Sequence, residues 1–275
     1  MDAFSAISPE LREKAKLYER VRATFARLRA ESVGGWVFRE GEVEVWACPW
    51  VDVFNGLMSP RWSSQNAGPS WRRAVQLYKA TGQGMFVSFG PSTTADNLRE
   101  IIRRDGFRCS YHVPFMHLDL DRLRDFPHLP GVSVELVTDF EIFRKQEHPW
   151  IGKLNTRIQK ARFRFVREQA QAESPDLWQF VARADEGRIV GSSLLFRHEN
   201  EGAIFDVAVH PDFRRRGIGT QLMTATCRFA QSLGLRELGL SASRRGVGLY
   251  EKVGFIEVGR YSDFFLSKGR VALLS

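Results

Sequence analysis

The sequence predicts an α/β (α+β) protein made of two domains. The chain has 275 residues, which is enough for two ordinary domains, and 43% of them are hydrophobic, which is typical of a globular protein. Short segments of alternating apolar residues are interleaved with segments that have helical periodicity. A weak internal repeat relates residues 98–107 to residues 246–255, because each copy follows a helix, a glycine turn and a strand. Two similar domains in tandem explain all three observations.

The N-terminal half begins with a predicted helix at 9–30. Ser8 is a favourable cap, and Pro9 suits the first helical turn because its missing N–H would have no partner there. The segment 61–70 is rich in Ser, Gly, Pro and Asn and is therefore predicted to be a loop. The other predicted elements are a hairpin at 36–47, a strand at 51–58, a helix at 71–80, a strand at 85–89, a helix at 94–104 and an extended segment at 111–120.

Pro127, Pro130 and Gly131 indicate a linker, so the expected domains are 1–126 and 132–275, joined by residues 127–131. The second domain is expected to contain a strand at 132–137, helices at 139–146 and 154–172, a hairpin at 179–197, a strand at 202–209, a helix from 220 and a strand at 237–241.

A basic, glycine-containing turn follows the strand at 202–209. Pro211 ends the strand because proline cannot donate a hydrogen bond to a sheet. Gly217 and Gly219 lack Cβ atoms, so the backbone can close around an anion at the start of the next helix. The first N–H groups of a helix have no internal partners, and the helix dipole favours negative charge there. The arginines at 214–216 add positive charge. The turn therefore predicts a phosphate site, and its spacing differs from the ATP-binding P-loop and the dinucleotide fingerprint.

Two motifs in this half resemble those of the GNAT N-acetyltransferase superfamily. The segment 207–211 followed by Arg214-x-x-Gly217-x-Gly219 is similar to that family's acetyl-CoA signature, Arg/Gln-x-x-Gly-x-Gly/Ala. The block 248–255 resembles a later family motif, a short helix that carries a tyrosine and closes with Gly-Phe. The resemblance covers about residues 132–266.

Together with the internal repeat, this resemblance makes the chain similar to tandem, two-domain GNAT proteins. It implies that each domain is a mixed, mostly antiparallel sheet flanked by helices. The N-terminal copy lacks the Arg-x-x-Gly-x-Gly motif between Val51 and Trp71, and Ile102 takes the place of Tyr250. We therefore expect the N-terminal copy to be degenerate and not to bind the cofactor.

The resemblance implies roles for individual residues. The backbone of 207–209 is expected to pair with the pantetheine arm of acetyl-CoA, and the Val209 amide to stabilise the oxyanion. Tyr250 is the candidate general acid, because a phenol with a pKa of about 10 stays protonated at neutral pH. The general base stays open between Asp206 and His210, and Ser192 and Ser193 are further candidates for the acceptor site. The expected cofactor-binding residues are Val207, Ala208, Val209, Arg214, Arg215, Arg216, Gly217, Ile218, Gly219, Thr220 and Ser243.

The predicted function is direct transfer of an acetyl group from acetyl-CoA to a primary amine of a small molecule, with no metal. The alternatives are a protein or peptide N-acetyltransferase and a non-catalytic, CoA-binding regulatory protein. The net charge of +8 also suits a nucleic-acid binder, but no recognition motif supports that, so no nucleic-acid partner is expected.

The remaining composition gives expectations about compartment and assembly. Three widely spaced cysteines suggest neither a disulfide framework nor a zinc site and fit a reducing compartment. The N-terminus lacks an apolar signal core, and no apolar run is long enough to span a bilayer. We expect a cytoplasmic protein without a membrane partner, either a monomer or a homodimer.

Overall fold

The computed structural model describes residues 7–48, 55–94, 97–137, 142, 163–168, 176–184 and 187–267. The chain divides into two compact units. The N-terminal unit comprises Met1–Pro114 together with Val258–Ser275, and the C-terminal unit comprises Phe115–Glu257. This division differs from the predicted boundary at residues 127–131, because the last strand of the chain pairs within the N-terminal unit. Nonlocal strand pairing of this kind leaves no local signal in a sequence.

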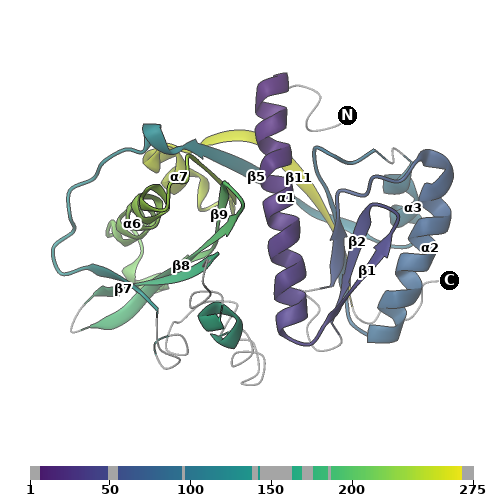
Figure 1. The fold of residues 1–275 in the computed structure, drawn as a ribbon, viewed down its shortest axis with the longest axis horizontal. Coiled ribbons are helices and arrows are strands. Elements are labelled where there is room, and N and C mark those ends of the chain that lie inside the picture. The colour runs from purple at the N-terminus through teal and green to yellow at the C-terminus, as the bar shows by residue number, and fades with distance from the viewer. Residues whose placement is uncertain are drawn as a thin grey trace. The chain divides into compact units, whose positions relative to one another are not determined.

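In the N-terminal unit, the strands run in the order β1-β2-β3-β4-β11-β5. The β3–β4 pair is parallel, whereas β1–β2, β2–β3 and β4–β11 are antiparallel. Figure 1 shows α1 and α2 on opposite sides of the β1–β2 hairpin. The elements are α1 (Pro9–Ser32), β1 (Trp36–Glu40), β2 (Val43–Ala47), β3 (Gly56–Met58), α2 (Ser64–Thr81), β4 (Met85–Phe89), α3 (Leu98–Arg104), β5 (Arg108–Asp119) and β11 (Ile256–Leu266).

The prediction of a loop at 61–70 is wrong, because α2 already begins at Ser64. The Ser63 hydroxyl accepts a hydrogen bond from the Asn66 N–H at 3.2 Å and so caps the helix. Ala67 and Trp71 are buried, and their packing outweighs the low helix propensity of this polar segment. Pro69 lies inside the helix, near its start. Composition alone therefore misplaced the beginning of α2.

In the C-terminal unit, the strands run in the order β5-β10-β9-β8-β7-β6. The β9–β10 pair is parallel, and the other pairs are antiparallel. Of the helices predicted at 139–146 and 154–172, the structure describes only residue 142 and residues 163–168, which are helical. The described elements are β6 (Ser133–Leu136), β7 (Leu177–Ala184), β8 (Arg188–His198), β9 (Glu201–Val209), α6 (Ile218–Ser232), β10 (Glu237–Ser241) and α7 (Val247–Val253).

The two sequence halves of the chain follow the same plan, although β11, the final strand of the second half, lies mostly in the N-terminal unit. Each has a hairpin, a third strand, a helix, a strand parallel to the third, a short helix and a long final strand. The run β1-β2-β3-α2-β4-α3-β5 thus corresponds to β7-β8-β9-α6-β10-α7-β11. The predicted fold, a mixed and mostly antiparallel sheet flanked by helices in each half, is confirmed.

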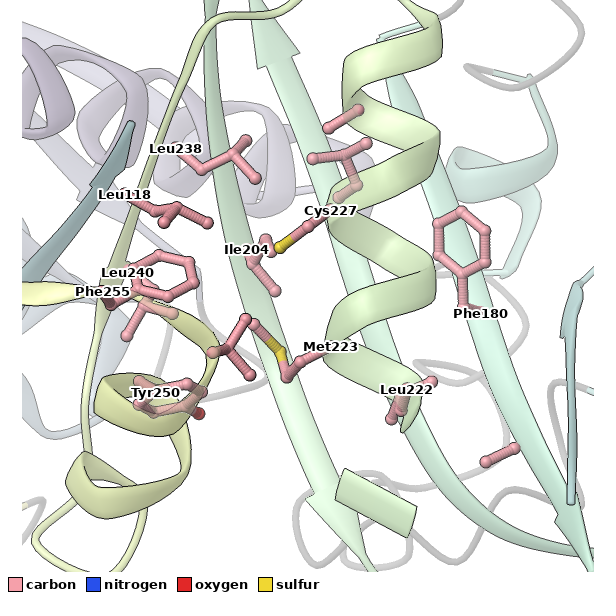
Figure 2. Close-up of a cluster of buried hydrophobic side chains, with 14 of the residues drawn as sticks. Leu118, Phe180, Ile204, Leu222, Met223, Cys227, Leu238, Leu240, Tyr250 and Phe255 are labelled. Atoms are coloured by element: carbon pink, nitrogen blue, oxygen red, sulfur yellow. The ribbon is translucent and has the colours of Figure 1, made fainter. Parts of the chain in front are cut away.

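The core of the C-terminal unit fixes α6 and α7 against the sheet. Figure 2 shows Met223 and Cys227 of α6 pointing toward strand residues such as Ile204, and Tyr250 of α7 lying beside the same cluster. These side chains are almost fully buried. Because α6 packs across β7, β8 and β9, the beginning of α6 is held beside the end of β9. In the part of the chain that the structure describes, no helix combines the length and apolar character needed to cross a bilayer.

One buried carboxyl group makes the stability of the N-terminal unit depend on pH. Glu19 of α1 is only 4% exposed, and its Oε2 accepts a hydrogen bond from the Ser92 N–H at 3.2 Å. Within the part of the chain that the structure describes, its Oε1 has no hydrogen-bond partner. Burial raises the pKa of Glu19 from 4.5 to about 7, although Ser92, Arg61 and Arg22 favour the ionised form.

We expect the free energy of unfolding to fall as the pH rises from about 4.5 to 7, by up to about 3 kcal/mol. In this window the folded state holds a proton that the unfolded state has already lost. Below the window both states are protonated, and above it the penalty is constant. Urea unfolding at pH 5 and pH 8 measures the difference. Glu19→Gln should flatten the pH dependence and raise stability at pH 8, whereas the exposed Glu10→Gln on the same helix should change neither. An unchanged slope in Glu19→Gln contradicts this account.

Candidate functional site

The two parallel strands of the C-terminal unit separate near their ends. Pairing of β10 with β9 involves Leu238 with Gly202 and Gly239 with Ala203, but β9 continues to Val209. Asp206 has a positive φ of 52°, and the register of β8 against β9 shifts opposite it. This β-bulge bends the last part of β9, which remains paired with β8. The end of β9 therefore faces an opening rather than a neighbouring strand.

The backbone of Val209 is directed into this opening. The His210 N–H donates to the Val190 carbonyl at 2.8 Å, so these two residues form a hydrogen-bonded pair. Residues in an antiparallel ladder alternate, so the N–H and C=O of Val209, one position earlier, point away from β8. The Val209 carbonyl accepts a hydrogen bond from Arg214 Nε at 2.9 Å. The Val209 N–H points in the same direction as that carbonyl and is well placed to donate to a ligand.

The turn after β9 presents the N-terminus of α6 to the same opening. Gly217 has a φ of 85° and caps α6, which begins at Ile218. Its left-handed conformation strains any residue with a side chain. The N–H groups of the first helical residues have no partner within the helix. Gly219 packs beneath α7, because a Cβ atom there would lie 3.1 Å from a methyl group of Leu249. The turn thus gathers unpaired N–H donors and the positive end of the helix dipole.

The third wall of the opening comes from α7. The chain turns after β10 through a hydrogen bond from the Gly246 N–H to the Ser243 carbonyl at 2.8 Å. Tyr250 is 6% exposed, and its ring contacts Phe255 edge-on with the centroids 6.0 Å apart. The aromatic ring is therefore fixed by packing on a helix that faces the end of β9.

These walls enclose a pocket of about 910 Å³. It brings together most of the residues that the sequence analysis singled out, and Asp206, Arg216 and Ile218 do not line it. The predicted residues that line it are Val207, Ala208, Val209, Arg214, Arg215, Gly217, Gly219, Thr220, Ser243 and Tyr250. The lining residues that the sequence analysis missed are Phe213, Arg245, Gly246, Gly248, Leu249 and Lys252.

The predicted residues that do not line the pocket lie in the core, in the bulge of β9 or against Phe213. The side chain of Ile218 is buried in the core, and the Arg216 guanidinium lies 5.1 Å from the centre of the Phe213 ring. Asp206 occupies the bulge in β9. His210, the other candidate base, packs edge-on against Phe213, and its Nδ1 accepts from the Asp212 N–H at 3.4 Å.

The two serines of β8 also lie outside the pocket. Ser193 Oγ is 2.7 Å from Thr226 Oγ1 and fills the buried interface between β8 and α6. Ser192 is buried, and its hydroxyl donates to the Asp206 carbonyl at 3.4 Å. The contact with Thr226 gives Ser193 a structural role in the packing of α6 on β8.

The pocket is strongly cationic. Its lining includes Arg214 and Arg215 on the turn and Arg245 and Lys252 on the α7 side, and none of its described lining residues is an aspartate or glutamate. Arg245 lies in the turn before α7 and Lys252 in its last turn, so helical spacing in the sequence does not mark them as a pair. Among the described residues, no group of three or more His, Cys, Asp or Glu side chains is arranged to hold a metal ion. The arrangement suits a polyanion with an extended, uncharged arm.

Comparison with known proteins agrees with this geometry. Residues 140–255 match the family model described as the acetyltransferase (GNAT) family. A curated glucosamine 6-phosphate N-acetyltransferase from Trypanosoma brucei brucei is 36% identical over 76 residues, which cover 25% of this chain and 52% of that protein. The chain thus spans about half the length of this relative.

Two solved structures share the fold over nearly the whole chain. A GCN5-related N-acetyltransferase from Kribbella flavida is 13% identical, with a TM-score of 0.63 over 90% of this chain and 95% of that one. A tandem GNAT protein from the clavulanic acid biosynthesis pathway is 14% identical, with a TM-score of 0.56 over 98% and 97% of the two chains. Residues 140–255 therefore match the acetyltransferase (GNAT) family model, and the two solved structures show the same fold over nearly the whole chain.

Proposed function

We propose that this protein transfers an acetyl group directly from acetyl-CoA to a primary amine of a small molecule. The observation that carries the proposal is the pocket that the end of β9, the N-terminus of α6 and Tyr250 line together. The N–H groups at the start of α6 can bind a diphosphate. The open edge of β9 can pair with a peptide-like arm. The Tyr250 phenol can donate a proton to the sulfur of a thioester.

Each part of the pocket has a distinct task in this proposal. The N–H groups from Arg215 to Thr220 and the neighbouring arginines bind the diphosphate of the co-substrate. The Val209 N–H donates to the thioester oxygen as negative charge develops on it, which lowers the barrier to attack by the amine. The Tyr250 hydroxyl holds a proton for the departing thiolate. Ser243 contacts the arm from the opposite wall.

Small amines are the proposed acceptor class. The match to glucosamine 6-phosphate N-acetyltransferase supports a small amine and suggests a phosphorylated amino sugar as the first compound to test. Release of CoA should be measured with glucosamine 6-phosphate, a polyamine, free amino acids and a peptide with a free N-terminus. Acetylation of a small amine supports the proposal, and turnover confined to the peptide overturns the acceptor class. Binding of acetyl-CoA without turnover of any amine favours a regulatory protein instead.

Asp206 is the proposed general base, because it is a carboxylate on β9 itself, next to Val207, which lines the pocket. We expect Asp206→Asn to lower kcat at pH 7 by at least about tenfold and to leave the Kd of acetyl-CoA unchanged. Asparagine also tolerates the positive φ at this bulge, so the backbone should be retained.

The pH dependence of kcat provides the second measurement for Asp206. The variant should regain activity toward high pH, where more of the amine is already neutral in solution. Unchanged turnover at every pH removes the proposed role. Asp212→Asn, at an exposed position in the following turn, is the matched control and should behave as the wild type.

A further inference from the structure

The segment between β5 and β6 bridges α6 and α7. This strap, residues 123–131, lies within the C-terminal unit and has no regular secondary structure over most of its length. At one end the Arg124 N–H donates to the Val253 carbonyl of α7 at 3.1 Å. At the other end the Leu129 N–H donates to Gln221 Oε1 of α6 at 3.0 Å. The strap is therefore attached to both helices that flank the pocket.

Both attachments lie next to residues that line the pocket. A Cβ atom on Gly217 would lie 3.5 Å from a methyl group of Leu129, so this leucine packs against the anion turn. Three residues earlier, the Phe126 ring lies 5.1 Å from Lys252 Nζ, and Lys252 lines the pocket. Phe126 is half-buried, with part of its ring held by the core and part exposed. The strap thus places an aromatic surface beside a cation at the edge of the pocket.

The pocket has more positive charge than a diphosphate alone requires. The turn residues Arg214 and Arg215 serve the N-terminus of α6, whereas Arg245 and Lys252 lie on the opposite, α7 side. CoA carries a second phosphate on the 3′ oxygen of its ribose. That ribose is joined directly to the diphosphate, so the adenosine must lie next to whatever binds the diphosphate. Leu129 of the strap packs against Gly217 of the anion turn, and the pocket that the turn lines also includes Arg245 and Lys252.

We propose that Phe126, Lys252 and Arg245 form a subsite for the 3′-phosphoadenosine end of CoA, in which the adenine stacks on Phe126 and the two cations bind the 3′-phosphate. This inference rests on the proposed co-substrate and adds a specificity for the phosphorylated nucleotide. Aromatic rings stack on any base, and exposed cations bind phosphate through charge-assisted hydrogen bonds. The subsite belongs partly to the connecting strap rather than to the motifs that bind the diphosphate.

Calorimetric titration of the full chain with CoA, 3′-dephospho-CoA and 4′-phosphopantetheine tests the subsite. The wild type should bind CoA about tenfold more tightly than dephospho-CoA, and Lys252→Gln should remove most of that difference without weakening dephospho-CoA. Phe126→Ala should weaken CoA and dephospho-CoA alike, by about fivefold, and leave phosphopantetheine unchanged.

The controls carry the same substitutions outside the pocket. Lys79→Gln on α2 and Phe265→Ala on β11 should leave all three affinities unchanged, because both residues lie in the N-terminal unit. Equal binding of CoA and dephospho-CoA by the wild type overturns the subsite and leaves the proposed function standing. Equal weakening of all three ligands in either pocket variant also overturns it, since that pattern indicates general damage. Failure of every ligand to bind overturns the subsite and the proposed function together.

Discussion

Replacing Tyr250 with phenylalanine is expected to lower kcat for amine acetylation by about 100-fold. The hydroxyl is the only group that the substitution removes, and a general acid contributes roughly this factor when the leaving group must gain a proton. The phenylalanine ring keeps the contact with Phe255 and the packing beside the α6 core, so the fold should be retained. The Kd of acetyl-CoA should not change, because the diphosphate and the arm are bound by other parts of the pocket. Steady-state kinetics and calorimetry measure the two quantities.

A buried tyrosine outside the pocket provides the control for this prediction. Tyr18 of α1 is also nearly fully buried, and Tyr18→Phe should leave kcat unchanged. A Tyr250→Phe enzyme with wild-type turnover shows that the proton comes from elsewhere, such as water. Parallel losses of turnover and acetyl-CoA affinity indicate instead that Tyr250 shapes the pocket.

Substituting valine for Gly219 is expected to weaken acetyl-CoA binding by about 100-fold or more. A branched side chain at position 219 covers the N–H groups at the start of α6. It also crowds Leu249, because a Cβ atom on residue 219 would lie 3.1 Å from a methyl group of that leucine. The anion then loses contact with the helix N-terminus, where its charge is stabilised. The smaller Gly219→Ala change should cost much less affinity, because the flexible end of Leu249 can move by a few tenths of an ångström.

This graded response separates a blocked anion site from a disturbed fold. Gly68 of α2 is a helical glycine at which a Cβ atom would make only ordinary van der Waals contacts, with Arg72 at 3.7 Å and Ile101 at 4.0 Å. Gly68→Val should therefore leave acetyl-CoA affinity unchanged. Equal affinities of Gly219→Val and the wild type contradict the placement of the diphosphate at this turn. Circular dichroism spectra of the variants verify that the fold is retained.

The anion turn and its flanking elements were predictable because their signals are local. Pro211 ends the strand, Gly217 and Gly219 shape the turn, and the apolar stripe that follows defines α6. The hydrophobic periodicity of α1 and the alternation of the β1–β2 hairpin are equally local, and both elements appear where they were expected. The fold class followed from these elements and from the resemblance of two motifs to a known family.

Other features depend on contacts between distant residues. The start of α2 is decided by burial of Ala67 and Trp71, which outweighs a composition typical of loops. The pairing of β11 with β4 joins residues far apart in the chain, so a linear division into domains could not describe the N-terminal unit. The positive φ of Asp206 arises where two strands fall out of register, and the residue type alone gives little sign of it.

The cationic α7 side of the pocket was missed for a different reason. Arg245 and Lys252 flank Tyr250 in the sequence. They line the pocket because α7 packs on Gly219 through Leu249. The contact between Phe126 and Lys252 likewise depends on the path of the strap. Such positions become visible only when the helices are placed in three dimensions.

Titration of the full chain with acetyl-CoA in a calorimeter tests the central claim most directly. The pocket at the end of β9 and the loss of the corresponding motif from the N-terminal unit predict one acetyl-CoA per chain, with binding abolished or strongly weakened in Gly219→Val. A chain that takes up no acetyl-CoA, or whose Gly219→Val variant binds it as the wild type does, contradicts the account.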